Sequence, residues 1–220
     1  MSTFQKGTKQ RVVKFAKKPD FFVDPSRLRN LTDQFLLLDF VFGQNPRYFE
    51  DYATDVRAIL QFSKEMKHNG SMTTSFLRSH SDSMCIHVRM TDFIRLKWQT
   101  DMNITVKAAI PLAKRKNITR FLIFGDDQQF MTNMSQAIIK DGRFENDAVI
   151  VSNYHESMDL YLSSQMCRSF LISAAVSTFG WWLAFFAKDQ SAVCYLNVTR
   201  PNALVRRRDF FYENLALVSR

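Results

Sequence analysis

The chain has 220 residues, of which 46% are hydrophobic and 23% are charged, a composition typical of a globular protein with a sizeable core. The net charge of +9 suggests a nucleic-acid partner, but six positive charges, with no acidic residue to offset them, lie before residue 19, at Lys6, Lys9, Arg11, Lys14, Lys17 and Lys18. The rest of the chain carries only +3 and has neither a zinc-finger spacing nor an aromatic–basic RNA-binding motif, so we expect no nucleic-acid partner.

Residues 1–82 have an irregular pattern. Asp24-Pro25-Ser26 and residues 44–47 are typical of loops or helix starts. Apolar residues at helical spacing predict one helix from about Tyr48 to Lys67. The segment His68 to Ser83 is rich in Asn, Gly, Ser and Thr, and we expect it to be a connector.

From residue 84 onward, short apolar runs alternate with amphipathic segments. The runs predict strands at residues 84–90, 121–124, 148–152, 169–173 and 192–198, and the segments between them predict helices near 103–116, 128–142, 158–166 and 178–188. Buried strands that alternate with helices form parallel sheets. We therefore predict a Rossmann-like α/β domain over residues 83–199, preceded by a front segment, 1–82, and followed by a tail, 200–220.

The three cysteines, Cys85, Cys167 and Cys194, lie far apart and form no C-x-x-C pair, which argues against a metal site. Cys85 and Cys194 fall in apolar, strand-like runs, so we expect both to be buried free thiols. The odd number also argues against a full disulfide framework.

Six N-x-S/T sequons indicate the secretory lumen; they begin at Asn30, Asn69, Asn103, Asn117, Asn133 and Asn197. Asn133 lies within a predicted helix and is a poor acceptor, which leaves the other five as candidate glycosylation sites. No signal peptide and no bilayer-spanning run is visible in the sequence. We therefore expect a lumenal protein whose membrane anchor lies outside this chain.

Parallel sheets bind ligands beyond the carboxyl ends of their strands, and polar residues follow the predicted strands there. His87 and Arg89 alternate with apolar residues on the first strand and project to the same side. A guanidinium at this place matches the oxygens of a diphosphate, and Asp92 could orient it or accept a proton. A surface pair of Arg89 with Asp92 that caps the strand is the alternative.

Two further sites follow the second and fourth strands. Asp127 can cap a helix without any ligand, so Asp126 is the better candidate to bind a base or ribose. Ser177 and Thr178 begin a helix, and a helix N-terminus binds anions, although simple capping would also explain them. A cation, a carboxylate and a helix N-terminus on one rim predict a nucleoside-diphosphate pocket. The sequence contains neither the G-x-G-x-x-G motif of dinucleotide-binding domains nor a P-loop, which argues against a dinucleotide-binding protein and an ATPase. The G-x-S-x-G motif of a nucleophile elbow is also missing.

Three motifs follow one another at residues 86–93, 121–127 and 158–182. In this order they resemble the motifs of the α1,2-fucosyltransferases, glycosyltransferase family 11. Residues 86–93 resemble the H-x-R-R-x-D-[YF] motif, and residues 121–127 resemble an apolar strand that ends in Ser-Asp-Asp. Residues 158–164, followed by 172–182, are similar to the third motif, which ends in Ser-Thr-Phe-Ser-Trp-Trp. The resemblance covers roughly residues 84 to 190.

This resemblance implies a GT-B fold, GDP-fucose as the donor, inversion at the fucose anomeric carbon, a galactosyl glycan as the acceptor and no metal cofactor. It also implies a Golgi location behind a type II membrane anchor, with residues 1–82 as the remnant of an acceptor-side domain. The roles it implies are pyrophosphate binding for Arg89, nucleotide positioning for His87, a place near guanosine for Asp126, phosphate contact for Ser177 and Thr178, and loop support for Asp92 and Asp159.

Two residues depart from the family pattern. Met90 stands where the first motif has its second arginine, and Gly180 stands where the third motif has serine. The 82 residues before the first motif are also fewer than the front half of a GT-B enzyme usually has. Two hypotheses follow: a fucosyltransferase, or a relative that binds GDP-fucose or a partner without turnover.

Overall fold

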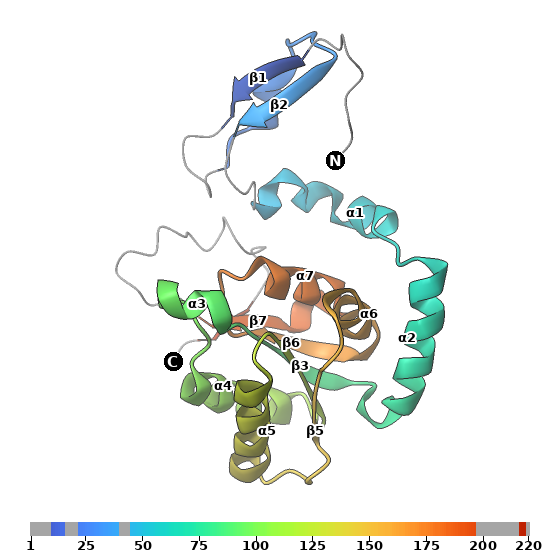
Figure 1. Ribbon diagram of the computed structural model, residues 1–220, viewed down its shortest axis with the longest axis vertical. Coiled ribbons are helices and arrows are strands. Elements are labelled where there is room, and N and C mark those ends of the chain that lie inside the picture. The colour runs from blue at the N-terminus through green and yellow to red at the C-terminus, as the bar shows by residue number, and fades with distance from the viewer. Residues whose placement is uncertain (1–9, 16–21, 40–44, 197–215, 219–220) are drawn as a thin grey trace. The chain divides into compact units, whose positions relative to one another are not determined.

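The computed structural model describes residues 10–15, 22–39, 45–196 and 216–218, the last three as backbone only (Figure 1). Packing divides these residues into two compact units, one that runs to Ala58 and one that comprises residues 59–196 and 216–218. The sequence pattern predicted a boundary after residue 82. The second unit therefore includes residues 59–82, which that prediction assigned to the front segment.

The first unit contains a pair of parallel strands, β1 (Gln10–Lys14) and β2 (Phe35–Asp39). Short 3-10 helices lie at Pro25–Leu28, Pro46–Tyr48 and Glu50–Tyr52, before α1 (Ala53–Ile59). The carboxylate of Asp24 and the amide of Asn45 each accept a backbone N–H at the start of a 3-10 helix. Both proline signals of the sequence therefore begin helical turns, as expected.

The single helix predicted over Tyr48–Lys67 is in fact two helices, so that prediction was wrong. After α1, a new helix, α2, spans Lys64–Phe76 and begins at Ser63, whose hydroxyl accepts the N–H of Met66 at 3.0 Å. The segment predicted to be a connector is largely part of α2. Gly70 lies directly against the ring of Tyr161, and packing of this kind outweighs the low helix propensity of the segment.

The second unit is a six-stranded, wholly parallel sheet with the order β5-β4-β3-β6-β7-β8. Its strands are β3 (Ser83–Val88), β4 (Phe121–Gly125), β5 (Val149–Val151), β6 (Cys167–Ile172), β7 (Val193–Leu196) and β8 (Ala216–Val218). The other helices are α3 (Thr91–Leu96), α4 (Met102–Arg115), α5 (Gln128–Gly142), α6 (Glu156–Met166) and α7 (Thr178–Phe186). The predicted parallel α/β class is confirmed.

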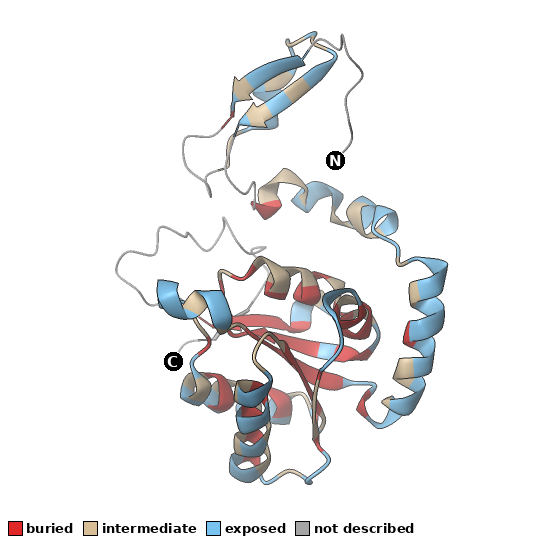
Figure 2. Ribbon diagram, viewed as in Figure 1, coloured by how far each residue is buried: buried red, intermediate tan, exposed pale blue. Residues whose placement is uncertain are grey.

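Helices cover both faces of this sheet (Figure 1). Ile86 and Val88 of β3 point to the face covered by α4 and α5, where they share a core with Met134 and Ile138. The alternate residues of β3 face α6 and α7. Figure 2 shows the buried residues concentrated in the strands and on the inner sides of these helices. Burial on both faces explains why the strands are continuous apolar runs in the sequence.

In the second unit, α3 and β8 were not predicted, and in the first unit neither β1 nor β2 was. α3 has no capping side chain of its own, because Met90 stands at its N-cap position, so the sequence carries no local start signal. β8 lies within the predicted tail, 200–220, and pairs in parallel with β7. A strand of three residues is too short to produce a recognisable pattern.

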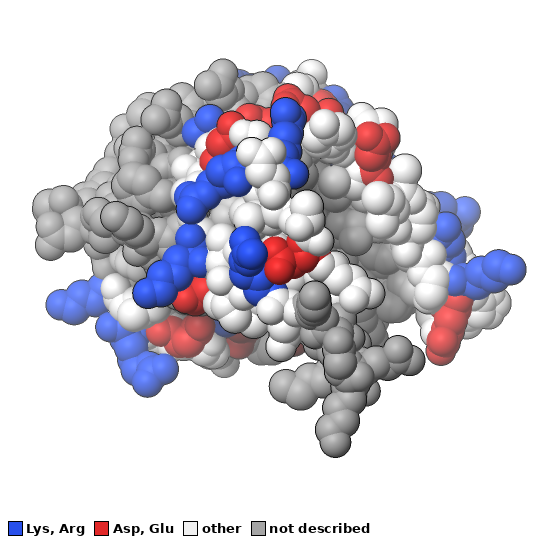
Figure 3. Space-filling view, turned by 90° about the horizontal axis from the view of Figure 1, so that it is seen from above, with Lys and Arg blue, Asp and Glu red and all other residues white. Residues whose placement is uncertain are grey.

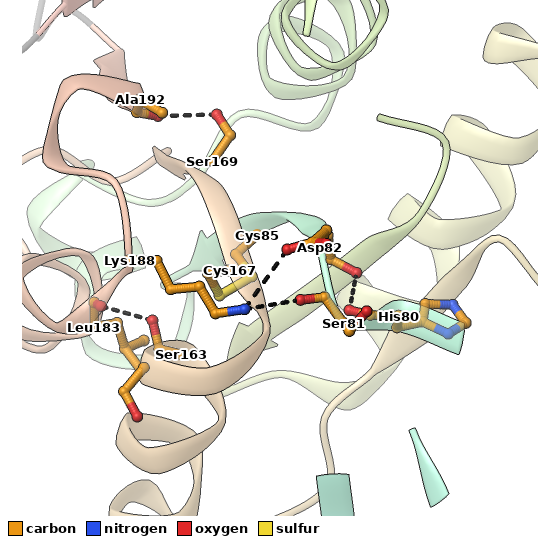
Figure 4. Close-up of a disulfide and its surroundings, with 12 residues drawn as sticks. His80, Ser81, Asp82, Cys85, Ser163, Cys167, Ser169, Leu183, Lys188 and Ala192 are labelled. Carbon is orange, nitrogen blue, oxygen red and sulfur yellow. Dashed lines mark hydrogen bonds and ion pairs between the residues drawn. A yellow bond between two sulfur atoms is a disulfide. The ribbon is translucent and has the colours of Figure 1, made fainter. Parts of the chain in front are cut away.

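Cys85 and Cys167 form a disulfide between β3 and β6, with 5.4 Å between their Cα atoms, so the prediction of a free thiol at Cys85 was wrong (Figure 4). The two residues are 82 positions apart in sequence, and only the strand order makes them neighbours. Cys194 is a buried free thiol, as predicted. Figure 4 also shows Lys188 near this disulfide, where it donates a hydrogen bond to the carbonyl of Ser81 and forms an ion pair with Asp82.

None of the helices in the described residues has the length and hydropathy of a bilayer-spanning segment. Several charged side chains of the second unit form ion pairs. Arg120, for example, bonds to both Glu145 and Asp147. Figure 3 shows acidic side chains beside basic ones on the face of the molecule that it draws.

Candidate functional site

The strand order creates a switch point between β3 and β6. From β3 the chain continues to β4 and β5 on one side and then returns to β6 on the other. At such a point the loops that leave two neighbouring strands diverge and open a crevice, where open α/β sheets bind their ligands. Arg89 directly follows β3, and Ser177 stands between β6 and α7, so both predicted phosphate contacts lie on the loops of this switch point.

Arg89 is held from one side by two carboxylates. Its Nε donates to Asp92 at 2.9 Å and lies 3.4 Å from Oδ2 of Asp126, while the guanidinium carbon lies 5.6 Å from the centroid of the Phe93 ring. The side chain keeps 30% of its exposure. Among the described residues no hydrogen-bond acceptor reaches Nη1 or Nη2 of Arg89, so the outer edge of the guanidinium can receive a ligand.

Asp92 is exposed and serves mainly to orient this arginine. Its carboxylate accepts hydrogen bonds from Arg89 and from the hydroxyl of Thr91. The hydrogen bond from Arg89 holds the pKa of Asp92 below its ordinary value. A carboxylate with a lowered pKa is a weak proton acceptor, which weakens the alternative role of Asp92 as a base.

Asp126 fastens the turn that carries Arg89. Its Oδ1 accepts the N–H of Met90 at 2.8 Å, and its Oδ2 accepts the N–H of Thr91 at 3.2 Å and also the Thr91 hydroxyl. These are the unsatisfied donors at the start of α3, so Asp126 caps that helix from a neighbouring strand. In this arrangement the carboxylate of Asp126 is occupied by the β3–α3 turn.

A buried chain of hydroxyl groups, which sequence analysis missed, also fixes the end of β3. The N–H of Arg89 donates to Oγ1 of Thr100, and the N–H of Thr100 donates back to the carbonyl of Arg89, both at 2.9 Å. The Thr100 hydroxyl lies 2.7 Å from that of Ser173, which in turn bonds to the carbonyl of His87. The backbone on either side of Arg89 is therefore tied to the loop after β6.

His87 lies beneath α7 and is completely buried. Neither ring nitrogen has a hydrogen-bond partner among the described residues. Burial lowers the pKa of His87 to about 3, so the ring is neutral at physiological pH. The ring packs against Gly180 and, edge to face, against Phe179. In this structure the imidazole supports the first turn of α7 and supplies no charge to the rim.

Ser177 begins α7, and its hydroxyl accepts the N–H of Gly180 at 3.3 Å. This is the capping role that sequence analysis considered as the alternative. Thr178 follows and is partly exposed. Within the described part of the chain, the backbone N–H groups of Thr178 and Phe179 have no acceptor, and such groups at a helix N-terminus attract anions.

Asp159 lies apart from this group, in the first turn of α6, and only 4% of it is exposed. The hydroxyl of Ser152, at the end of β5, donates to its carboxyl group. Burial raises the pKa of Asp159 to about 7, against the lowering effect of that hydrogen bond. The hydrogen bond between Ser152 and Asp159 ties the end of β5 to α6.

The structure thus brings Arg89, Asp92 and Asp126 into one ion-paired group, with His87 and the start of α7 beside it. Among the described residues, no three His, Cys, Asp or Glu side chains gather into a potential metal site. Asn30, Asn69, Asn103, Asn117 and Asn133 are all exposed, and Asn69, Asn103 and Asn133 lie in helices. Asn197 lies outside the described residues.

The family model described as glycosyl transferase family 11 matches residues 28–214. The chain belongs to this family. Its relatives in Caenorhabditis elegans include a protein with a provisional glycosyltransferase name, 29% identical over 86% of this chain and 54% of its own length. Two others are named galactoside 2-alpha-L-fucosyltransferase. One is 24% identical over 85% of this chain and 54% of its own length. The other is 27% identical over 80% of this chain and 50% of its own length. This chain therefore spans about half the length of the curated relatives it matches.

A solved structure shares the fold of this family 11 member. The crystal structure of POFUT1 in complex with GDP-fucose aligns with a TM-score of 0.52, at 11% identity, over 73% of this chain and 53% of that chain. Similarity at this level of identity concerns the fold alone, and it confirms the predicted GT-B-like class.

Proposed function

We propose that this chain forms the donor-binding part of an inverting fucosyltransferase, which transfers L-fucose from GDP-fucose to a galactose hydroxyl of a glycan in α1,2 linkage. The observation that carries the proposal is the place of Arg89. It stands at the switch point of the sheet with the outer edge of its guanidinium open. Membership of family 11 and relatives named as galactoside fucosyltransferases support the choice of donor sugar and acceptor.

The main catalytic requirement of this reaction is stabilisation of the departing GDP anion. In an inverting transfer the acceptor oxygen bonds to the anomeric carbon as the bond to the diphosphate breaks, and negative charge grows on the leaving group. Arg89 supplies a fixed positive charge, and the free N–H groups of Thr178 and Phe179 supply aligned dipoles. Because Asp92 and Asp126 hold Nε, the guanidinium can present Nη1 and Nη2 to the phosphate with little loss of entropy.

A second function, donor binding without turnover, is favoured by the position of Met90. Its side chain packs against the hydrophobic core of the second unit, and because a thioether is uncharged it cannot act as a second cation for the leaving group. Arg89 and the start of α7 would then hold GDP-fucose, but with less stabilisation of the leaving anion. The two functions differ in kcat and share the same donor site.

The test is calorimetry with GDP, beside a transfer assay with GDP-fucose and a galactosyl acceptor. We expect Arg89→Ala to weaken GDP binding by at least about tenfold, as loss of a charge-assisted hydrogen bond would. Arg95→Ala, which removes an exposed arginine of the adjacent α3, is the matched control and should bind GDP like the wild type. GDP binding with transfer supports the enzyme, and GDP binding without transfer supports the second function. No GDP binding by the wild type would contradict both.

We extend the proposal to a lumenal location, in the Golgi. The exposed sequons and the Cys85–Cys167 disulfide support it, because disulfides persist in oxidising compartments. Treatment of the protein from secretory cells with a peptide N-glycosidase should lower its apparent mass. An unchanged mass, together with staining outside the secretory pathway, would contradict this location.

A further inference from the structure

An aromatic pair next to Arg89 has no role in donor binding as proposed above. The guanidinium of Arg89 lies over the ring of Phe93, and the ring of Trp98 meets Phe93 edge to face, with 6.4 Å between centroids. Trp98 is therefore one aromatic ring away from the cation that would hold the diphosphate.

The segment that carries Trp98 is held in place by backbone hydrogen bonds. The N–H of Trp98 donates to the carbonyl of Phe93 at 3.0 Å, and Thr100 bonds to Arg89 as described above. Lys97, which directly precedes Trp98, has the positive φ of a helix C-cap and ends α3. Trp98 is thus a positioned side chain on the rim of the site.

Several exposed side chains of this rim are apolar. Trp98 is 37% exposed, and Ile94 and Leu96 of α3 are more than half exposed. Trp181 and Trp182, by contrast, pack against Phe185 within α7. Clustered apolar side chains at the edge of a ligand site often form part of that site, since water contact is unfavourable for them.

We propose that the indole of Trp98 is the platform on which the galactose ring of the acceptor stacks. One face of a galactopyranose carries several C–H groups and few hydroxyls, and the negatively charged face of an indole attracts such C–H groups. The proposal rests on the proposed transfer to a galactoside. The fucosyl group lies next to the diphosphate, so an acceptor sugar would lie one ring farther from Arg89, as Trp98 does.

A nucleobase could also stack on an indole. Ile94 and Leu96, the exposed apolar residues of the same segment, cannot hydrogen-bond to the edge of a base, so we favour the sugar. The test measures GDP affinity beside acceptor affinity and thereby separates the two occupants.

The test compares Trp98→Ala and Trp98→Phe with the wild type. Phe76→Ala, which removes an aromatic residue of α2 that is 85% exposed, is the control. We expect Trp98→Ala to raise the KM for a galactosyl acceptor about fivefold to tenfold, Trp98→Phe to raise it less, and Phe76→Ala to leave it unchanged. The dissociation constant for GDP, measured by calorimetry, should stay within about twofold in all variants.

An unchanged acceptor KM in Trp98→Ala would overturn the inference, and so would a parallel loss of GDP affinity, which would place the nucleobase on Trp98. Saturation-transfer NMR with methyl β-galactoside separates this result from failure of the proposed function, because it requires neither donor nor turnover. A saturation-transfer signal of the galactoside that is present with the wild type and disappears with Trp98→Ala supports the platform, even if the chain does not catalyse fucosyl transfer. Absence of this NMR signal with the wild type overturns the inference.

Discussion

The imidazole of His87 occupies the space that the missing side chain of Gly180 leaves open. A Cβ atom on Gly180 would lie 2.4 Å from Nδ1 of His87 and 2.8 Å from Cγ, far inside van der Waals contact. The glycine that departs from the family motif is therefore a packing partner of the histidine of the first motif. In this chain the two residues together fix the distance between β3 and α7.

We predict that Gly180→Ala destabilises the protein, although alanine favours helices. Helix propensity alone would stabilise the variant by about 1 kcal/mol. Forcing a methyl group against a buried ring costs about 1–3 kcal/mol, and the His87 ring that it would meet is completely buried. Chemical denaturation should therefore show a net loss of free energy of unfolding.

A double-mutant cycle provides the control for this prediction. In a His87→Ala background the ring is absent, so Gly180→Ala should become neutral or stabilising. The same loss of stability in both backgrounds would show that the alanine acts elsewhere in α7.

The sequence predicted five of the six strands of the second unit's sheet, because each of these five is a continuous apolar run, a pattern that burial on both faces requires. It placed Asp127 correctly as the cap of α5, since the carboxylate and the N–H of Phe130 lie three residues apart. It missed α3, whose cap, Asp126, comes from 35 residues away. Local signals are visible in a sequence, and contacts between distant segments are not.

The same limit explains the differences at the site. Alternation along β3 placed His87 and Arg89 on the same side, but it could not show that α7 covers the first and leaves the second open. Thr100 gave no signal, because its partners Arg89 and Ser173 meet it only in the folded protein. The Cys85–Cys167 pair likewise depends on the strand order.

Asp126 offers a test of how the Arg89 turn is positioned. We predict that Asp126→Ala lowers the free energy of unfolding by about 1.5–3 kcal/mol, since several donors lose a charged acceptor. It should also weaken GDP binding, because the turn would no longer hold Arg89. Asp92→Ala removes a more exposed partner and should affect stability much less. Denaturation and GDP calorimetry on both variants measure these effects; equal, small effects would contradict a clamping role for Asp126.

The raised pKa of Asp159 predicts a pH effect of definite sign. Between about pH 4 and pH 7 the folded chain keeps a proton on Asp159 that the unfolded chain has lost, so this group's contribution to stability falls as pH rises and is constant above the folded pKa of about 7. Asp159→Asn imitates the protonated carboxyl group. The variant should therefore be more stable than the wild type at pH 8, by up to about 4 kcal/mol, and similar to it near pH 4.

This effect must be measured as the difference between variant and wild type. His87, whose pKa is lowered to about 3, changes stability in the opposite direction between pH 3 and pH 6.5, and it acts equally in both proteins. Asp127→Asn is the control, since aspartate and asparagine cap helices about equally well. A stability difference for Asp159→Asn that does not vary with pH would show that Asp159 is ionised in the folded protein.

The disulfide between Cys85 and Cys167 gives a prediction that two simple measurements check. Thiol titration of the denatured chain should find one thiol without reductant and three after reduction, since the chain has three cysteines and Cys194 is free. The bridge closes a long loop, so its loss should lower the free energy of unfolding by roughly 4 kcal/mol. Cys85→Ala with Cys167→Ala should show this loss, whereas Cys194→Ala removes a buried thiol and keeps the bridge. Three thiols in the unreduced protein would contradict the pairing, and would also remove one of the two observations that support a lumenal location.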